Sequence, residues 1–170
     1  MEREWIIQFK NGDSHAFKKL YDLYAEDAIR YAMSITKNSH NAKDVVQEAF
    51  IRVYRNIDSF DIDRNFKTWL FTILTNECYR YLKKESENIK LVDNNIPTSV
   101  QQESEDFMYL HEALENLDAI NKTPIILKYL NGFSEKEIAS MLNLNLNTVK
   151  SRLFKGREKL KRLIGSDYVG

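Results

Sequence analysis

The sequence predicts an all-α protein made of two small helical domains joined by an acidic, flexible linker. Apolar side chains recur at spacings of three and four residues through most of the chain, which is the period of amphipathic helices. Only five Gly and two Pro occur among 170 residues, which disfavours a turn-rich β architecture. Periodicity is lost over a polar, acidic stretch that has too little apolar surface to fold alone. We therefore expect domains at 1–86 and 107–170, with the linker at 87–106.

The composition argues against several classes of protein. Apolar residues make up 43% and charged residues 29% of the chain, which suits a packed core rather than wholesale disorder. The longest apolar run has four residues, at 107–110, whereas a membrane-spanning helix needs about 20, and no signal peptide is visible near Met1. Cys78 is the only cysteine, so no intramolecular disulfide can form, and we expect a cytoplasmic protein without direct membrane insertion.

No pattern in the chain indicates an enzyme or a metal protein. The three histidines are scattered and show, with Cys78, no metal-ligand spacing. Neither a glycine-rich phosphate loop nor the motif of an activated serine occurs. We therefore expect no catalytic residues, no cofactor, no metal and no small-molecule substrate.

The first domain is expected to hold four helices. A short helix around residues 5–9 precedes a break, after which Asp13 or Ser14 can cap the second helix. A polar stretch at 58–65 lacks periodicity and is expected to be a loop before the fourth helix. The apolar stripes of the three longer helices are Phe17, Leu20, Tyr21, Tyr24, Ala28, Tyr31 and Ile35; Val45, Val46, Ala49, Phe50, Val53, Tyr54 and Ile57; and Phe66, Trp69, Leu70, Ile73, Leu74, Cys78, Tyr81 and Leu82.

The second domain contains the pattern of a helix-turn-helix. Ser134 and Glu137 have the spacing of a capping box, in which each side chain bonds the backbone N–H of the other residue. Asn143 stands where the turn needs a left-handed residue, and Asn145 can cap a helix from Leu146 to about Leu163. Two helices joined by a short turn, the second rich in cations, are typical of DNA-binding modules.

Charge is segregated along the chain although the total is zero. Residues 1–86 have a net charge of +1, residues 87–121 of −7, and residues 122–170 of +6. In the last helix, Leu146, Val149, Leu153, Leu160 and Ile164 share one side at 100° per residue. Cations and short polar side chains on the opposite side suit phosphates and base edges in a major groove. This opposite side holds Asn147, Thr148, Ser151, Arg152, Lys155, Lys159 and Arg162, with Phe154 at its edge.

The fourth helix of the first domain combines aromatic rings with cations. Single-stranded nucleic acid offers a π-face at each base and a phosphate at each nucleotide, so such a helix suits it. Phe66 and Trp69 are expected to belong mostly to the core, whereas Asn76, Tyr79 and Arg80 lie away from the centre of the stripe. The whole set is Phe66, Trp69, Phe71, Tyr79 and Tyr81, with Lys67, Arg80, Lys83 and Lys84 among them.

Three segments resemble bacterial extracytoplasmic-function (ECF) sigma factors of RNA polymerase. The family's region 4 helix-turn-helix is closely similar to residues 133–160, FSEKEIASMLNLNLNTVKSRLFKGREKL, although LuxR-type regulators share a version of it. Its region 2.2 resembles residues 41–60, NAKDVVQEAFIRVYRNIDSF, and its regions 2.3 and 2.4 resemble residues 66–85, FKTWLFTILTNECYRYLKKE. The segments follow the order and spacing of the family across nearly the whole chain. Three positions depart from the family: Lys43 replaces a usual acid, Asn143 a common Gly, and Asn147 a small residue.

The resemblance implies a sigma factor with three sets of contact residues. It would bind the β and β′ subunits of core polymerase, recognise promoter DNA, and be held inactive by an anti-sigma factor, which in the family is often anchored in the membrane and sequesters the sigma factor there. In the family the acidic linker threads the path of the nascent RNA, while composition alone equally allows a simple spacer. The −35 duplex would be read by Asn147, Thr148, Lys150, Ser151, Arg152, Phe154 and Lys155. The unwound −10 strand would be read by Phe60, Asp61, Asp63, Arg64, Asn65, Asn76, Tyr79, Arg80 and Lys83, and polymerase by Asp44, Gln47 and Glu48.

The alternative is a stand-alone helix-turn-helix transcriptional regulator. Such a protein would bind duplex DNA through its last helix without needing core polymerase. It would also need an effector or receiver domain, and residues 1–86 lack the alternating strands of a receiver.

Overall fold

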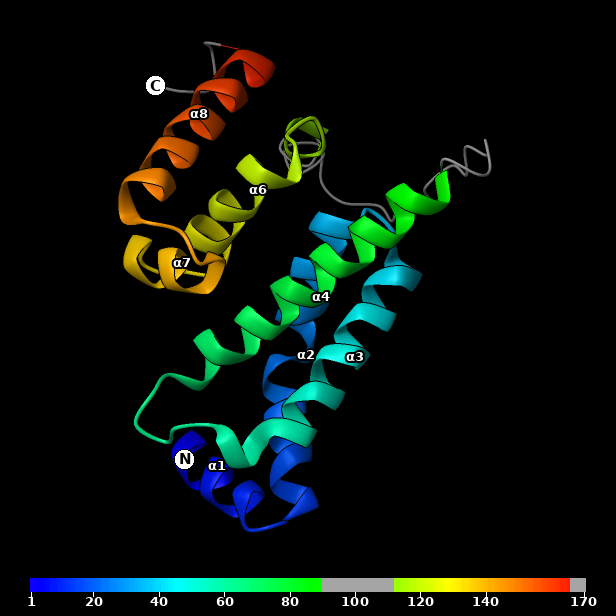
Figure 1. The fold of residues 1–170 in the computed structure, drawn as a ribbon, viewed down its shortest axis with the longest axis vertical. Helices are drawn as coiled ribbons and strands as arrows, with labels where there is room; N and C mark the ends of the chain where they lie inside the picture. Colours follow the sequence, from blue (N-terminus) through cyan, green and yellow to red (C-terminus); the bar gives the residue numbers. More distant parts are fainter. Residues whose placement is uncertain (90–111, 166–170) are drawn as a thin grey trace. The chain divides into compact units, whose positions relative to one another are not determined.

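The computed structural model describes residues 1–89 and 112–165, which fall into two compact units divided between Asn94 and Asn95. Every regular element within these ranges is helical, so the prediction of an all-α fold with two helical domains is confirmed (Figure 1). The predicted linker at 87–106 lies outside the described residues except for its first three positions, which continue the preceding helix to Ile89.

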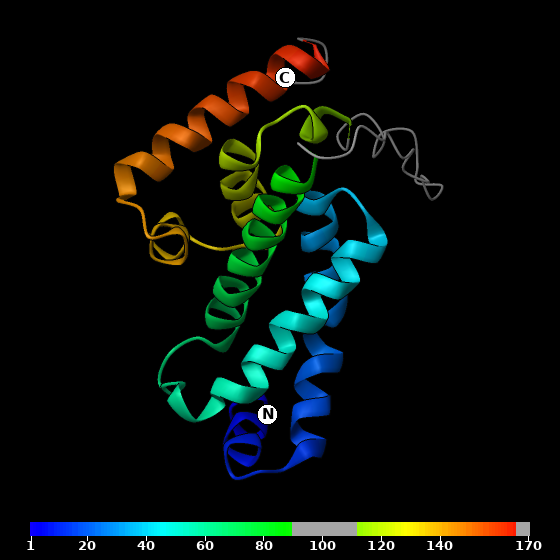
Figure 2. The same cartoon turned by 45° about the vertical axis from the view of Figure 1, so that its right-hand side comes forward.

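Unit 1 is a helical bundle with a short helix at one end. Its elements are α1 (Glu2–Lys10), α2 (Ser14–Thr36), α3 (Ser39–Asn56), the single 3-10 turn η1 (Ile57–Ser59) and α4 (Phe66–Ile89). The three long helices pack against one another along their lengths, and α1 lies beside η1 at the end where α3 turns into α4 (Figures 1 and 2).

Local capping sets the boundaries of α2 and α3 in unit 1. The Asp13 carboxylate accepts the backbone N–H of His15 at 2.8 Å, which confirms it as the cap of α2. Lys37 ends α2 in the left-handed conformation with φ of 60°. The side chain of Asn38 then accepts the N–H of Asn41 at 3.1 Å and starts α3. Two helices are thereby separated by only two residues, so they pack antiparallel.

The core of unit 1 is built mainly from the three predicted stripes, and Phe71, which was grouped with the aromatic rings suited to nucleic acid, also belongs to this core. Tyr31, Leu70, Phe71 and Leu74 are almost completely buried, and the rings of Tyr31 and Phe71 meet edge to face with centroids 5.4 Å apart. The Thr75 hydroxyl donates to the Phe71 carbonyl, so the buried Tyr31 hydroxyl donates to Thr75 at 2.6 Å. This polar link ties α2 to α4 without leaving an unsatisfied group.

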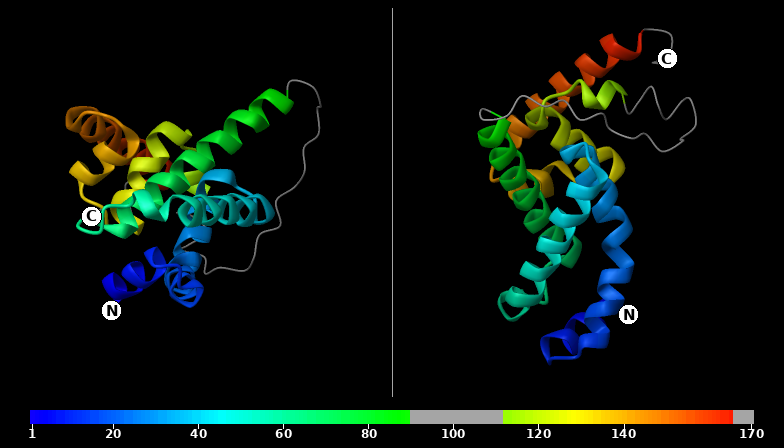
Figure 3. Two further views of the ribbon diagram at one scale, coloured as in Figure 1. Left: turned by 60° about the horizontal axis from the view of Figure 1, so that its bottom comes forward. Right: turned by 90° about the vertical axis from the view of Figure 1, so that its right-hand side faces the viewer.

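Unit 2 contains the helix-turn-helix. Its elements are α6 (Ala119–Ile125), the π-helical turn η2 (Ile126–Leu130), α7 (Glu135–Leu142) and α8 (Leu146–Ile164) (Figure 3). The capping box is present, with the Ser134 N–H donating to Glu137 at 2.7 Å and the Glu137 N–H donating to Ser134 at 3.2 Å. Asn143 adopts φ of 52°, as the turn requires, and Asn145 caps α8.

Gly156 permits a close approach between α8 and α6. It is buried, and a Cβ atom at this position would lie 2.9 Å from Cγ1 of Ile125 and 3.3 Å from the carbonyl oxygen of Asn121. Glycine inside a helix normally costs about 1 kcal/mol relative to alanine. Here the absence of a side chain lets two backbones pack closely.

Among residues 1–89 and 112–165, no helix combines the length and the apolar character needed to cross a membrane.

Replacing Gly156 with Ala is expected to destabilise unit 2 by about 1–3 kcal/mol, because overpacking outweighs the gain in helix propensity. The measurement is urea unfolding followed by circular dichroism. Trp5 and Trp69 both lie in unit 1, so their fluorescence transition should stay unchanged. Lys159→Ala, at an exposed position of α8, is the control and should change stability by under about 0.5 kcal/mol. A stabilised Gly156→Ala protein would contradict the packing argument.

The Cys78 thiol is expected to be unreactive in the folded protein. Burial raises the pKa of Cys78 to about 12, so almost no thiolate exists at pH 8. Because the folded pKa is the higher one, this group favours folding at neutral pH and loses that contribution as the pH rises from about 9 to 12. Labelling with a thiol reagent at pH 8 should be slow in buffer and fast in denaturant. Labelling in buffer at the rate of a free thiol would contradict this prediction.

Candidate nucleic-acid interface

α8 has a buried face and an opposite polar face. Val149, Leu153 and Gly156 are buried against α6 and α7, as the predicted phase requires. Of the residues predicted to read duplex DNA, Thr148 and Arg152 are half-buried. The others are exposed: Asn147, Lys150, Ser151, Phe154, which is 58% exposed, and Lys155. All seven residues therefore lie on α8 outside its buried face of Val149, Leu153 and Gly156.

The start of α8 is fixed by its cap. The side-chain oxygen of Asn145 accepts the backbone N–H of Thr148 at 2.8 Å and its hydroxyl at 2.9 Å. The N–H of Leu144 donates to the carbonyl of Ala139 at 2.9 Å, which closes the turn after α7. These bonds hold the first turn of α8, where N–H groups and the helix dipole favour an anion, in a set direction relative to α7.

Two further contacts brace the helix-turn-helix. Lys128 on η2 donates to Glu135 on α7 at 2.7 Å, and this hydrogen bond holds the pKa of Glu135 below its usual range. Arg157 on α8 donates to the Tyr129 hydroxyl at 2.9 Å. The turn from η2 and the two helices α7 and α8 are thus linked by side chains as well as by the apolar core.

The loop before α4 holds five of the residues predicted to read the unwound −10 strand, and they differ in burial. Phe60 is buried, with its ring 4.8 Å from that of Trp69 and 5.5 Å from that of Phe66. Asn65 caps α4, because its side-chain oxygen accepts the Thr68 N–H at 2.9 Å. The three charged residues of the loop, Asp61, Asp63 and Arg64, are exposed. The buried ring and the cap fix the loop, and the charged side chains face solvent.

The remaining predicted −10 residues follow one side of α4. Asn76, Arg80 and Lys83 are exposed, and Tyr79 is half-buried. From Asn65 to Lys83 the helical rise spans about 27 Å, which is long enough to meet several nucleotides of an extended strand. Asn76 and Arg80 border a groove of about 290 Å³ between α3 and α4, lined by Arg52, Asn56, Ser59, Trp69, Ile73, Asn76, Glu77 and Arg80.

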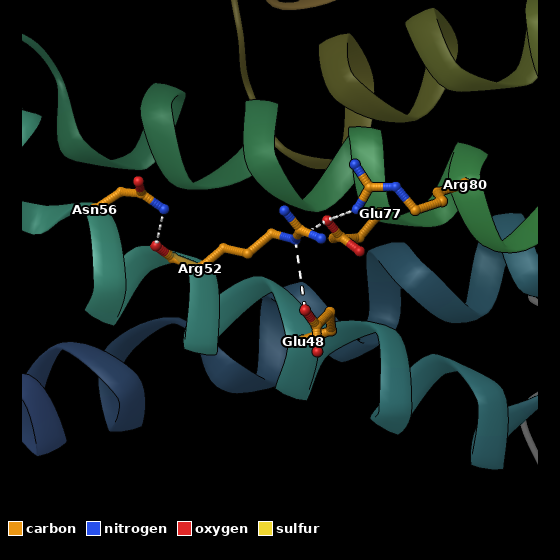
Figure 4. Close-up of polar contacts among 5 residues, drawn as sticks. All are labelled: Glu48, Arg52, Asn56, Glu77 and Arg80. Atoms are coloured by element: carbon orange, nitrogen blue, oxygen red, sulfur yellow. Dashed lines mark hydrogen bonds and ion pairs between the residues drawn. The ribbon is translucent and has the colours of Figure 1, made fainter.

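A buried carboxylate organises this groove. Glu77 is only 6% exposed, and Arg52 from α3 and Arg80 from α4 both pair with its Oε1 atom (Figure 4). Glu48 approaches Arg52 from the other side at 3.5 Å, where both side chains are partly solvated. The pairing joins α3 to α4 and holds both guanidinium groups beside Glu77. The exposed Arg80 side chain is thereby kept in one orientation.

The predicted polymerase-binding residues are neighbours on one face of α3, at spacings of three and four residues, but they have different surroundings. Asp44 is exposed beside His40 at 3.6 Å, and Glu48 faces Arg52. Gln47 instead borders an open groove between α2 and α3 with a volume of about 640 Å³. Tyr21 and Tyr54, which the stripes predicted to face the core, are 38% and 52% exposed along this groove. The lining comprises Phe17, Tyr21, Ile29, Lys43, Val46, Gln47, Phe50, Ile51, Tyr54 and Arg55.

The sequence analysis missed two residues of the groove between α3 and α4. Arg52 lies four residues after Glu48, which resembles an ordinary surface pair. Glu77 lies four residues after Ile73 within the apolar stripe, and an acid in such a place signals a buried cationic partner. In the part of the chain that the structure describes, no group of three or more His, Cys, Asp or Glu side chains could hold a metal ion.

The two units match the two DNA-facing regions of one class of transcription factor. Residues 20–87 match the family model of Sigma-70 region 2, and residues 107–160 match that of Sigma-70 region 4. The chain is 35% identical to the ECF RNA polymerase sigma factor SigW of Bacillus subtilis, over 95% of this chain and 96% of that protein. It is 32% identical to the ECF RNA polymerase sigma-E factor of Escherichia coli K12, over 91% and 90%. The chain belongs to the ECF sigma factors of RNA polymerase.

Two solved structures with similar folds match most of this chain. The sigma factor RpoE, in complex with the anti-sigma factor NepR from Bartonella quintana, has a TM-score of 0.76 at 29% identity, covering 89% of this chain and 98% of that one. CnrH, in complex with the cytosolic domain of CnrY, has a TM-score of 0.75 at 26% identity, covering 98% of both chains. An engineered region 2 of sigmaE in complex with GTAAAA covers 54% of this chain and 95% of that one, with a TM-score of 0.51 at 35% identity.

Glu77→Gln is expected to destabilise unit 1 by about 1–3 kcal/mol, because it removes the charge that two arginines share while keeping the shape of the side chain. Urea unfolding followed by tryptophan fluorescence measures the effect. The control is Glu48→Gln, whose carboxylate is 45% exposed and should contribute under about 1 kcal/mol. Equal stability of the two variants would show that Glu77 does not organise the groove.

Proposed function

We propose that this sigma factor brings core RNA polymerase to promoters by reading two separate DNA elements, one with each unit. Unit 2 would read the −35 element as duplex through α8, and unit 1 would read the −10 element as an unwound strand through the loop and α4. The observation that carries the proposal is that each unit turns one polar, cation-bearing helix face toward solvent while its apolar face is buried.

For the −35 element, the chemistry of α8 suits a major groove. Arg152 can donate two hydrogen bonds to a guanine edge, and Asn147 can pair with adenine. The exposed ring of Phe154 can contact a thymine methyl group, and Lys150 and Lys155 can bind phosphates. The Thr148 hydroxyl donates a hydrogen bond to the Asn145 side chain. Toward DNA, the same hydroxyl oxygen would therefore act as a hydrogen-bond acceptor.

For the −10 element, the chemistry of unit 1 suits separated bases. Tyr79 offers a ring for stacking, and Arg80 and Lys83 offer charge to phosphates. The acidic loop repels phosphates, so Asp61 and Asp63 suit contacts with the polar edge of a base that has left the stack. The similar region 2 of sigmaE was solved with the oligonucleotide GTAAAA, which supports a strand as the ligand of this unit.

The polymerase would dock on the outer side of α3. Asp44, Gln47 and Glu48 provide polar contacts, and the adjoining groove with Tyr21 and Tyr54 provides apolar area. In this proposal the polymerase carries out nucleotide transfer, and the sigma factor supplies the address and assists strand separation. Both act in the cytoplasm, where polymerase and promoters are found.

An anti-sigma factor would regulate this protein by covering its contact surfaces. The proposal is supported by the similar sigma factor RpoE, which was solved in complex with the anti-sigma factor NepR.

Paired substitutions should separate the two activities. Arg152→Ala with Lys155→Ala should weaken −35 recognition, with each lost base contact costing about 1–3 kcal/mol, and should spare core binding. Asp44→Ala with Glu48→Ala should weaken core binding and should spare −35 recognition by unit 2. Core binding is measured by co-purification with core polymerase, and promoter recognition by run-off transcription from the reconstituted holoenzyme. Loss of core binding in the α8 variant would contradict the division of labour. Duplex binding by the unmodified chain without transcription would indicate a stand-alone regulator.

A further inference from the structure

The loop that precedes α4 is held from outside by the first helix of the chain. Lys10 Nζ donates to the carbonyl oxygen of Phe60 at 2.6 Å and to that of Asp58 at 3.1 Å. Arg3 pairs with the Asp63 carboxylate at 3.1 Å and donates to the carbonyl of Ile62 at 3.4 Å. Two cations of α1 thus contact four acceptors between residues 58 and 63, a segment about fifty residues or more further along the chain.

α1 is itself fixed to the bundle, so its two cations act from a defined position. Phe9 is buried, and its ring lies 4.9 Å from that of Phe17 and 5.5 Å from that of Tyr54. At the other end of the helix, the Tyr24 hydroxyl donates to Glu2 at 2.7 Å. Burial and this carboxylate raise the pKa of Tyr24, so its hydroxyl remains a donor. Because both ends of α1 are fixed to the bundle, its Lys10 and Arg3 side chains hold the loop in a defined position.

The loop's own hydrogen bonds are local. The Asp63 N–H donates to the Asp61 carboxylate at 3.0 Å, and the Arg64 N–H donates to the Asp61 carbonyl at 3.0 Å. Such bonds shape the turn but do not place it relative to α4. Placement comes from the buried ring of Phe60 and from the Lys10 ammonium, which bonds the carbonyl of the same residue. Hydrogen bonds to a charged donor are roughly twice as strong as neutral ones.

We propose that Lys10, assisted by Arg3, is a positioning residue for base recognition: it fixes the backbone at Asp58 and Phe60 so that the charged side chains of the loop meet the −10 base in one geometry. The inference rests on the proposed function of that loop. It assigns a role in DNA recognition to α1, which precedes the Sigma-70 region 2 match at residues 20–87.

The consequence concerns discrimination between bases more than affinity. Lys10 does not contact DNA in this scheme, so its removal leaves the positive charge of α4 in place. A loop that samples several positions still meets a strand but no longer favours one base by the same ratio. Arg3 is exposed at 63%, so its pair with Asp63 should contribute less.

The test uses holoenzyme reconstituted from core polymerase and the full chain. Barcoded promoter templates are randomised over the −35 and −10 elements, and transcripts are counted to obtain a preference ratio between bases at each position. Lys10→Met, which keeps the length but loses the donors, should lower the preference at one −10 position about tenfold. It should leave the −35 preferences unchanged. Lys10→Arg should retain most of the preference, and Arg3→Met should lower it less than Lys10→Met.

Lys18→Met is the matched control, because Lys18 is an exposed lysine of α2 whose partner is Asp22. It should preserve every preference. Thermal unfolding of each variant identifies any general loss of structure. If Lys10→Met is unfolded, the −10 preferences of Arg3→Met and Lys10→Arg test the inference instead. Undiminished −10 preference in Lys10→Met and Arg3→Met would overturn the inference, as would an equal loss in Lys18→Met. An unmodified chain that shows no −10 preference would instead overturn the proposed function.

Discussion

Burial of one apolar stripe on each long helix is the interaction on which both interfaces depend. In unit 1, α4 contributes Leu70, Phe71, Leu74 and Cys78 to the core, and all four are almost inaccessible to solvent. Because a helix turns 100° per residue, burying these positions turns the opposite side of α4, with Asn76, Arg80 and Lys83, toward solvent. The same constraint acts in unit 2, where the buried Val149 and Leu153 fix which side of α8 faces solvent. Hydrophobic packing therefore sets the direction of polar side chains that make no packing contacts themselves.

Charge refines the arrangement that packing establishes. A carboxylate buried between two helices is costly unless cations satisfy it, and Arg52 and Arg80 meet that need at Glu77. In the loop before α4, two backbone carbonyl oxygens accept hydrogen bonds from the ammonium of Lys10. In both places a cation bridges segments distant in sequence, so the geometry of the −10 surface depends on three helices rather than on α4 alone.

The sequence was most informative where structure is local. The capping box at Ser134, the left-handed turn at Asn143 and the cap at Asn145 each depend on a few neighbouring residues, and all three were predicted correctly. The sequence pattern did not predict the long-range contacts. Helical period alone cannot show that Tyr54 lines an open groove, since a stripe wider than the contact with the next helix leaves its edge exposed. Nor can it reveal that Lys10 bonds carbonyl oxygens, because every residue carries a carbonyl and the acceptors leave no mark on the sequence.

Helix capping at the edges of both DNA-facing surfaces limits how promoter preference can evolve. Asn65 caps α4 and Asn145 caps α8. The amide oxygen of each accepts a hydrogen bond from the backbone N–H three residues ahead. A substitution at either position would loosen the helix before it altered any base contact. Neighbours without such duties, for instance the exposed Asn147 and Ser151, can change identity while the scaffold stays intact. Divergence of specificity among descendants of this protein should therefore concentrate within the first two turns of α8, leaving its cap, Asn145, constant.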